Sequence, residues 1–248
     1  MQILSIHKRS IYHPHFSEDF FYSYQLTDHI LVCAVMDGCS SAKDSHFSSA
    51  LFSKSIHKSC RMLPQMKEIV EDFDLATMEL NEIGNFILKQ LFDDLKKTKR
   101  LFFLSTEELL STLSLLIYNH DTLKACIKIS GDGLFAINGR ITSIDQNNVP
   151  NFLGYHLAKN FEDVKLSAIA TYNFENANDV CIATDGIDKL RKDLKNPEEI
   201  NETRYAFLVE KPSKKSDLFF EKQYKKLALK GFTLYDDLSI MRIINPKD

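Results

Sequence analysis

The stretch ILVCAVMDGCSSAKDSHF, from Ile30 to Phe47, decides the fold prediction. It begins with an unbroken apolar run, which is typical of a strand buried on both faces. The run ends at Asp37 and Gly38, three small residues follow, and helical periodicity starts near Asp44. Glycine lets a backbone carbonyl approach an ion because no Cβ stands in the way. We therefore expect this strand to bring a carboxylate and a carbonyl to one site, and Asp44 or Ser45 to cap the helix.

The rest of the chain alternates between strand and helix patterns. Strand patterns cover residues 19–26, 111–118, 123–129, 179–184 and 238–244, and helical spacing covers 44–63, 75–97 and 197–229. YNHDTL at 118–123 and SGDGLFAING at 130–139 are interpreted as hairpin turns. The order predicts an α+β fold, a four-layer αββα sandwich of two mainly antiparallel sheets flanked by helix pairs. With no repeat or linker visible, we expect residues 1–248 to form a single domain.

Composition excludes several classes of function. The 31 basic and 34 acidic residues give a net charge of −3, which offers no electrostatic case for nucleic acid. No apolar run approaches the roughly 18 residues of a membrane span, and the N-terminus lacks a signal-peptide pattern. Five cysteines without metal-binding spacing are interpreted as buried free thiols. We expect a cytoplasmic monomer with no nucleic-acid or membrane partner.

Acidic residues recur at the ends of the apolar runs. They are Asp37 in VMDG, Asp132 in SGDG, Asp185 in ATDG, and the pair Asp236 and Asp237 in YDD. A carboxylate at such a place costs several kcal/mol unless a partner neutralises it. A single Asp-Gly is most simply a tight turn, but three of them and an acidic pair favour a shared site. Oxygen ligands without His or Cys favour Mg²⁺ or Mn²⁺ over zinc.

At this point the motifs match a family. SEDFF, VMDGCSSAK, STLSLL, SGDGLFAINGR, ATDGID and DDLSIM, in this order, resemble the metal-dependent protein serine/threonine phosphatases of type 2C (PPM), over essentially the whole chain. The Ser-Ala-Lys at residues 41–43 is similar to a bacterial branch of that family. The resemblance implies two Mg²⁺ or Mn²⁺ ions, with a third, weaker ion in bacterial members.

The resemblance also implies roles for individual residues. Asp37 would bridge two ions and hold the hydroxide between them, and Asp19 would hold metal-bound water. The other ligands would be the Gly38 carbonyl, Asp185, Asp236 and, for the third ion, Asp132. Asp236 fits the ligand position of DDLS and Asp237 the position of a family Asn, because adjacent side chains of an extended segment point to opposite sides.

One family feature is missing. The arginine that grips the substrate phosphate in many relatives corresponds to Pro14, so Arg9, Lys43 and His13 are candidates to replace it. For His13 a solvated loop residue is an equally good interpretation. The variable flap of the family corresponds to residues 144–163, where substrate specificity would reside.

The leading hypothesis is a phosphatase that hydrolyses phosphoserine and phosphothreonine in a phosphorylated protein substrate. Two ions about 3.5–4 Å apart would activate the bridging hydroxide for in-line attack. The alternative is a catalytically weak or inactive phosphatase-like signalling or binding module, since an arginine is missing. A third, an unrelated α/β protein with coincidental turns, accounts less well for the order of the motifs.

Overall fold

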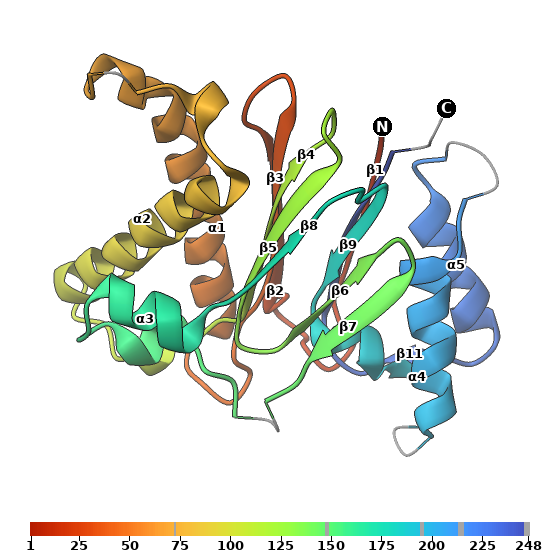
Figure 1. Ribbon diagram of the computed structural model, residues 1–248. Helices are drawn as coiled ribbons and strands as arrows, with labels where there is room; N and C mark the ends of the chain where they lie inside the picture. Colours follow the sequence, from red (N-terminus) through yellow and green to blue (C-terminus); the bar gives the residue numbers. More distant parts are fainter. Residues whose placement is uncertain (72, 147–148, 194–195, 213–215, 246–248) are drawn as a thin grey trace.

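Two five-stranded antiparallel sheets pack face to face in the computed structural model, which describes residues 1–71, 73–146, 149–193, 196–212 and 216–245 (Figure 1). The first sheet has the order β2-β3-β4-β5-β8, with strands Asp19–Gln25, Ile30–Asp37, Leu113–Asn119, Lys124–Ser130 and Ala170–Phe174. The second has the order β1-β12-β9-β6-β7, with strands Gln2–Lys8, Leu238–Ile244, Asp179–Ala183, Gly133–Ile137 and Arg140–Ile144. A short pair joins β10 (Leu190–Arg191) to β11 (Thr233–Leu234).

The alternation of β3 explains its continuous apolar run. Val32, Ala34 and Met36 pack in the core under the helices, whereas the residues between them pack against the other sheet. Strand side chains alternate between the two faces of a sheet, so a strand covered on both faces has no position for a polar residue. Asp37 ends the strand in register with the residues that face the second sheet.

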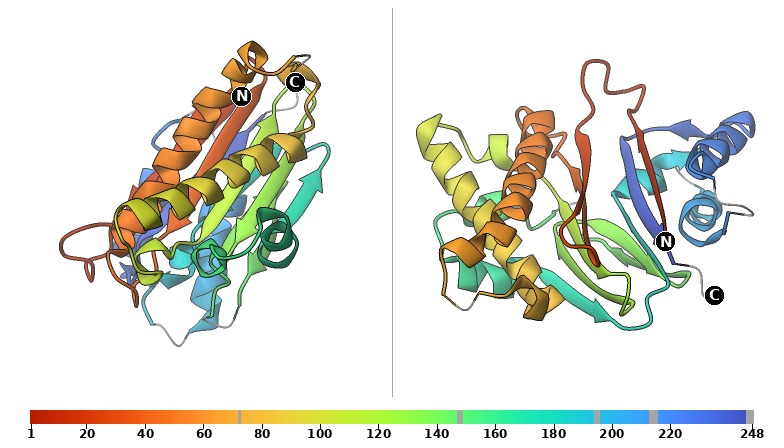
Figure 2. Two further views of the ribbon diagram at one scale, coloured as in Figure 1. Left: turned by 90° about the vertical axis from the view of Figure 1, so that its left-hand side faces the viewer. Right: turned by 90° about the horizontal axis from the view of Figure 1, so that it is seen from above.

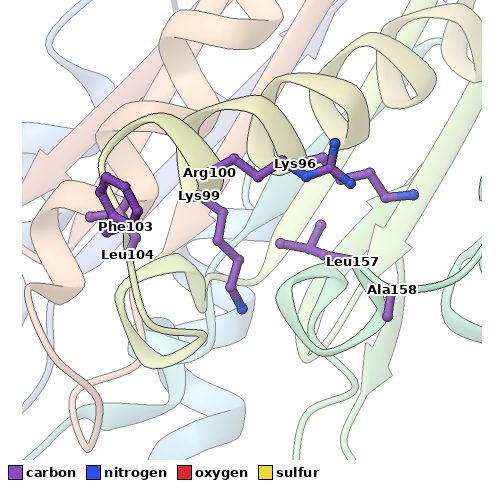
Figure 3. A pocket seen from close by; sticks show the side chains of 7 residues that line it. All are labelled: Lys96, Lys99, Arg100, Phe103, Leu104, Leu157 and Ala158. Atoms are coloured by element: carbon purple, nitrogen blue, oxygen red, sulfur yellow. The ribbon is translucent and has the colours of Figure 1, made fainter.

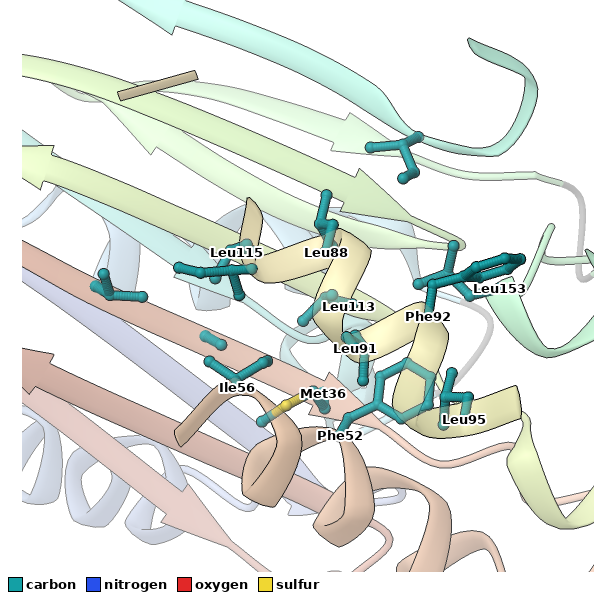
Figure 4. Close-up of a cluster of buried hydrophobic side chains, with 14 of the residues drawn as sticks. Met36, Phe52, Ile56, Leu88, Leu91, Phe92, Leu95, Leu113, Leu115 and Leu153 are labelled. Carbon is teal, nitrogen blue, oxygen red and sulfur yellow. The ribbon is translucent and has the colours of Figure 1, made fainter. Parts of the chain in front are cut away.

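Helices cover the outer face of each sheet, which gives four layers (Figures 1 and 2). Helices α1 (Ser45–Met62) and α2 (Leu80–Leu101) pack on the first sheet through a cluster of aliphatic and aromatic side chains (Figure 4). Helices α4 (Pro197–Arg204) and α5 (Phe219–Leu229) cover the second sheet, and α3 (Phe161–Ala168) lies beside α2. The predicted αββα sandwich is confirmed.

Some local predictions were wrong. A short 3₁₀ turn occupies Leu75–Thr77, and α2 begins only at Leu80, because Glu79 and Glu82 form a capping box there. Asp44 occupies the N-cap position of α1 with a left-handed backbone, but its side chain makes no capping hydrogen bond. The helical stretch predicted over 197–229 is a helix pair, α4 and α5, but a π-helical turn at Tyr205–Val209 follows α4 and was not predicted.

The stretch SGDG is a crossover between the sheets, not a hairpin turn. Strand β5 before it belongs to the first sheet, and β6 after it belongs to the second. The hairpin turn lies at the end of the predicted stretch 130–139, at Asn138 and Gly139, which have φ angles of 51° and 84°. Positive φ at both central positions is the geometry of a tight hairpin between β6 and β7. Asp132 therefore lies where the chain passes from one sheet to the other.

Candidate active site

Asp19 and Asp37 face each other at the end of the first sheet. They are directly opposite in the register of β2 and β3, and like charges in that position repel. The second sheet reaches the same place, because the Thr184 hydroxyl after β9 donates a hydrogen bond of 2.7 Å to Asp19 Oδ2. The site is thus built at one end of the interface between the two sheets.

Asp185 and Asp236 complete an acidic cluster with these two residues. Asp185 opens a 3₁₀ turn after β9, and Asp236 precedes β12, the neighbouring strand in the second sheet. Loss of hydration, together with the charge of Asp185, raises the pKa of Asp236 to about 6. The predicted ligand positions are therefore electrostatic neighbours, although they come from four separate segments.

The cluster carries more negative charge than its surroundings neutralise. Loss of hydration raises the pKa of Asp37 and of Asp19 well above the usual range, with nearby carboxylates contributing in the same direction. Asp19 is 1% exposed, and its Oδ1 receives no hydrogen bond from any described residue. A buried oxygen without a donor, beside other carboxylates, requires a proton or a cation. The donor set fits a hard divalent ion such as Mg²⁺ or Mn²⁺.

Two glycines let the backbone pass close to the cluster. A Cβ at Gly38 would come within 2.0 Å of the Ser45 carbonyl oxygen, and one at Gly186 within 1.6 Å of the Asp237 carbonyl oxygen. Any side chain would push the backbone apart at both places. Gly38 and Gly186 are therefore required by close packing, whether or not their carbonyl groups bind an ion.

Asp237 is a structural hub beside the cluster. Its Oδ1 accepts from the Ser10 amide at 2.6 Å, and its Oδ2 accepts from the Ser17 hydroxyl at 3.0 Å and the Glu18 amide at 2.5 Å. Burial opposes the charged form, but these hydrogen bonds and His13 outweigh it, so the pKa of Asp237 is lowered. Asp237 thereby fixes the loop between β1 and β2 against the start of β12.

The three candidate phosphate-binding residues have different contacts. Arg9 donates to the His15 carbonyl at 3.1 Å, and Lys43 is exposed near Glu107 and Glu108. His13 pairs with Asp237 Oδ2 at 3.0 Å. Burial lowers the pKa of His13, but Asp237 and neighbouring carboxylates outweigh that effect and raise it. These contacts do not by themselves assign a phosphate-binding role to any of the three residues.

Asp132 and the flap segment lie at the edge of the cluster. Asp132 accepts from the Gln146 amide at 2.8 Å, and burial, Asp145 and Asp185 raise its pKa. The described part of the predicted flap contains a 3₁₀ turn at Leu153–His156 and the start of α3, while residues 147 and 148 lie outside the described residues. The chain thus places Asp132 close enough to Asp185 for their charges to interact.

A different cluster lies at the other end of β3. His29, His120 and Asp121 have ligand atoms within 4.8 Å of one another, and they alone among the described residues form such a group of three. His29 and His120 each contact the Asp121 carboxylate, at 2.6 and 2.9 Å. Because β3 separates the two clusters, the histidine group takes no part in the acidic site.

Comparison with known proteins agrees with this arrangement. A family model described as protein phosphatase 2C matches residues 8–219. The chain belongs to the protein phosphatase 2C family. The acidic motifs are spread along this chain, and the fold brings them to one end of the sandwich. No curated protein sequence matches this phosphatase 2C-like chain.

Solved structures share the fold at low sequence identity. The phosphatase domain and a fragment of the regulatory domain of SpoIIE from Bacillus subtilis match with a TM-score of 0.63 and 14% identity over the whole of this chain. This chain spans 63% of that SpoIIE chain. A serine/threonine phosphatase of S. agalactiae matches with a TM-score of 0.65 and 12% identity, covering 98% of this chain and 99% of that one.

RsbX, crystallised in complex with magnesium, is also similar. Its TM-score is 0.57 at 15% identity, with coverage of 97% of this chain and 92% of RsbX. Likenesses of this degree establish the fold. No helix in the described part of this chain is long and apolar enough to cross a membrane.

Sequence reasoning missed three residues that shape the site. Thr184 orients Asp19, Asp237 fixes the loop before β2, and Glu18 accepts from the Ser45 hydroxyl at 2.7 Å. Thr184 directly precedes Asp185, and Glu18 directly precedes Asp19, in the quoted motifs. Their positions in the sequence could therefore have marked them as site residues. The hub role of Asp237 had no such signal, because its partners are far away in the sequence.

Proposed function

We propose that this chain hydrolyses phosphoserine and phosphothreonine in proteins with Mg²⁺ or Mn²⁺ bound at the acidic cluster. The observation that carries the proposal is the unpartnered, buried Oδ1 of Asp19 opposite Asp37, in a chain of the protein phosphatase 2C family. The buried carboxylates of the cluster destabilise the fold, and a bound cation would remove this unfavourable contribution to the folding free energy. A cytoplasmic monomer remains part of the proposal.

The chain offers ligands for two ions and a third. Asp37 and the Gly38 carbonyl would hold the pair, with Asp185 and Asp236 completing the second ion and Asp132 a weaker third. When bound, such ions lower the pKa of water and neutralise phosphate oxygens. Asp19, oriented by Thr184, would position water at the cluster.

The substrate phosphate still needs cations from the protein. Lys43 is exposed and close to the acidic end of β3 in sequence, and Arg9 lies on the loop that Asp237 fixes. His13 is held by Asp237 with a raised pKa, which favours its charged form near neutral pH. We propose that Lys43 or Arg9 binds the phosphate and that His13 carries a positive charge at the rim of the site.

The second candidate function is a phosphatase-like signalling or binding module with weak or no catalysis. The observation in its favour is Pro14 in place of the phosphate-gripping arginine. Under this alternative the acidic cluster would bind metal without turnover. Metal binding alone therefore does not separate the two functions, and a rate measurement is needed.

The test is hydrolysis of a chromogenic phosphate ester with and without Mn²⁺. We expect activity only with the metal, and Asp37→Asn should abolish it while the circular dichroism spectrum remains that of a folded protein. Asp121→Asn, the same chemical change at the other end of the molecule, is the matched control and should keep full activity. Metal-independent activity, or full activity in Asp37→Asn, would refute the assigned site; no activity with metal bound would favour the binding module.

A further inference from the structure

A pocket of about 640 Å³ lies at the C-terminal end of α2, outside the acidic cluster (Figure 3). Lys96, Lys99 and Arg100 contribute cations from the last turns of the helix, while Phe103 and Leu157 contribute apolar walls. Positions four apart on a helix share one face, so Lys96 and Arg100 extend to the same side, whereas the Lys99 side chain extends away from them (Figure 3). The pocket therefore combines positive charge with an apolar floor.

The cations of this pocket are available to a ligand. In the described part of the chain, none of the three forms an ion pair with a carboxylate; Lys96 donates to the Lys159 carbonyl and Lys99 to the Thr106 hydroxyl. Elsewhere on the same helix, Lys89 is paired with Asp93. Positive charge is thus concentrated at the pocket. The charge of Lys99 also interacts with Glu107 and helps to lower the pKa of that carboxyl, but the net charge of the pocket lining is positive, and charge complementarity calls for an acidic ligand.

Phe103 occupies an unusual position at the pocket wall. It follows the C-cap Phe102, has a φ of 54° and is 93% exposed. The Leu104 amide donates to the Lys99 carbonyl at 3.0 Å, which is the closing bond of a helix-ending Schellman motif. That motif normally has glycine where this chain has Phe103, because a left-handed backbone penalises a Cβ. Phe103 is thus an exposed aromatic ring at a strained backbone position, and such outliers concentrate at functional sites.

The pocket is connected to the acidic cluster. The segment that leaves it runs directly to Leu110 and Thr112, and the Leu110 carbonyl accepts from the Cys39 amide at 3.1 Å. The Thr112 amide donates to the Asp37 carbonyl at 2.8 Å. A ligand seated in the pocket would therefore lie on the same edge of the molecule as the candidate active site.

We infer that this pocket docks the protein substrate through an acidic segment with an apolar anchor, an inference that rests on the proposed phosphatase function. The acidic residues would pair with Lys99 and Arg100, and the apolar side chain would insert beside Phe103 and Leu157. The pocket is concave, which favours a protein side chain that can insert into it. A membrane surface would instead contact a protruding face of a protein. The choice of substrate would then depend on a segment of the substrate protein that is separate from the phosphorylated residue.

The test uses a fluorescent peptide that carries glutamates around a leucine, with a lysine-substituted peptide as the negative probe, in an anisotropy titration. We expect Phe103→Gly and Arg100→Glu to weaken binding by at least about tenfold. The matched controls are Phe102→Ala, a neighbouring exposed ring, and Lys97→Glu, the same charge change on an exposed lysine of the same helix that does not line the pocket. Both controls should change binding less than about twofold.

Phe103→Gly separates docking from a structural role. Glycine suits the left-handed position, so the thermal midpoint should stay the same or rise while peptide binding is lost. Attaching a phosphoserine to the acidic peptide through a flexible spacer should lower KM relative to the lysine version, and this advantage should vanish in Phe103→Gly. Turnover of the chromogenic ester should be unchanged in all four variants.

Each negative outcome has a distinct meaning. Equal effects of Arg100→Glu and Lys97→Glu, or unaltered binding in Phe103→Gly, would overturn the docking site. Binding to anionic lipid vesicles that Phe103→Gly abolishes, without peptide binding, would replace the protein ligand with a membrane. Peptide binding in a chain that hydrolyses no ester would leave the docking site standing and refute only the phosphatase.

Discussion

The Asp237 side chain positions residues of the acidic site without itself needing to bind a metal ion or substrate. Its two carboxylate oxygens accept from Ser10, Ser17 and Glu18, and Asp19 follows Glu18 directly. Because these hydrogen bonds fix the loop before β2, they also fix the position of Asp19. Asp236, its neighbour, instead interacts with Asp185 and is the better candidate for a metal ligand.

We expect different defects in the two neighbours. Asp236→Asn should lower Mn²⁺ affinity and activity with little loss of stability, because it removes a repelling charge. In Asp237→Asn, the side-chain NH₂ group would face an N–H or O–H donor from which the Asp237 carboxylate now accepts a hydrogen bond. The lost hydrogen bond should cost about 1–3 kcal/mol of folding free energy. Urea unfolding and calorimetric Mn²⁺ titration of both variants measure the two effects. The assignment is reversed if Asp237→Asn loses metal affinity while Asp236→Asn keeps it.

At this scale the sequence predicted the acidic residues but not their supports. Asp37, Asp185 and Asp236 stood out because each ends or precedes an apolar run, a local pattern. The hydrogen bonds of Asp237 join residues at opposite ends of the chain, and no local pattern encodes such a pairing. The pairing of Asp19 with Thr184 was hidden for the same reason.

At the scale of elements, a buried ion pair ties the second sheet to its helices. Arg242 on β12 binds both oxygens of Asp179 on β9 at 2.8 Å, and it donates to the carbonyls of Phe207, Val209 and Glu210. These carbonyls belong to the π-helical turn after α4 and its end. The helical spacing over 197–229 did not indicate this turn, because the side chain that holds it comes from a distant strand.

Removing the arginine should destabilise the fold strongly. Arg242→Met leaves the Asp179 carboxylate unpaired in the interior, which costs about 3–5 kcal/mol. The double variant Arg242→Met with Asp179→Asn should recover part of this loss, since no charge then remains buried. Urea denaturation followed by circular dichroism compares them, and a double variant no more stable than the single one would contradict the argument.

At the scale of the whole molecule, the acidic cluster makes stability depend on pH and on metal. The pKa of Asp236 is about 6 in the fold, against roughly 3.9 in an unfolded chain. The folded state therefore holds more protons, and the metal-free protein loses stability as pH rises from about 4 through about 6. The lowered pKa of Asp237 acts in the opposite direction but only below that window.

Mn²⁺ should offset this loss. We expect the metal to raise the thermal midpoint more at about pH 7.5 than at about pH 5, because protons compete with the ion for the carboxylates. Thermal unfolding with and without Mn²⁺ at both pH values measures the difference, and Asp236→Asn should reduce it. An equal rise at both pH values would show that the stabilising ion binds elsewhere.

The pairing of β1 with β12 has a consequence for the life of the protein in the cell. Gln2 lies opposite Ile244, so β12, the strand between β1 and β9, joins the second sheet only after residues 2–244 have been synthesised. Until then Asp236 is not yet available to Asp185, and β9 lacks a neighbour on one side. Translation proceeds from the N-terminus, and distant pairings form slowly. A nascent chain therefore cannot assemble the acidic cluster before β12 has been synthesised.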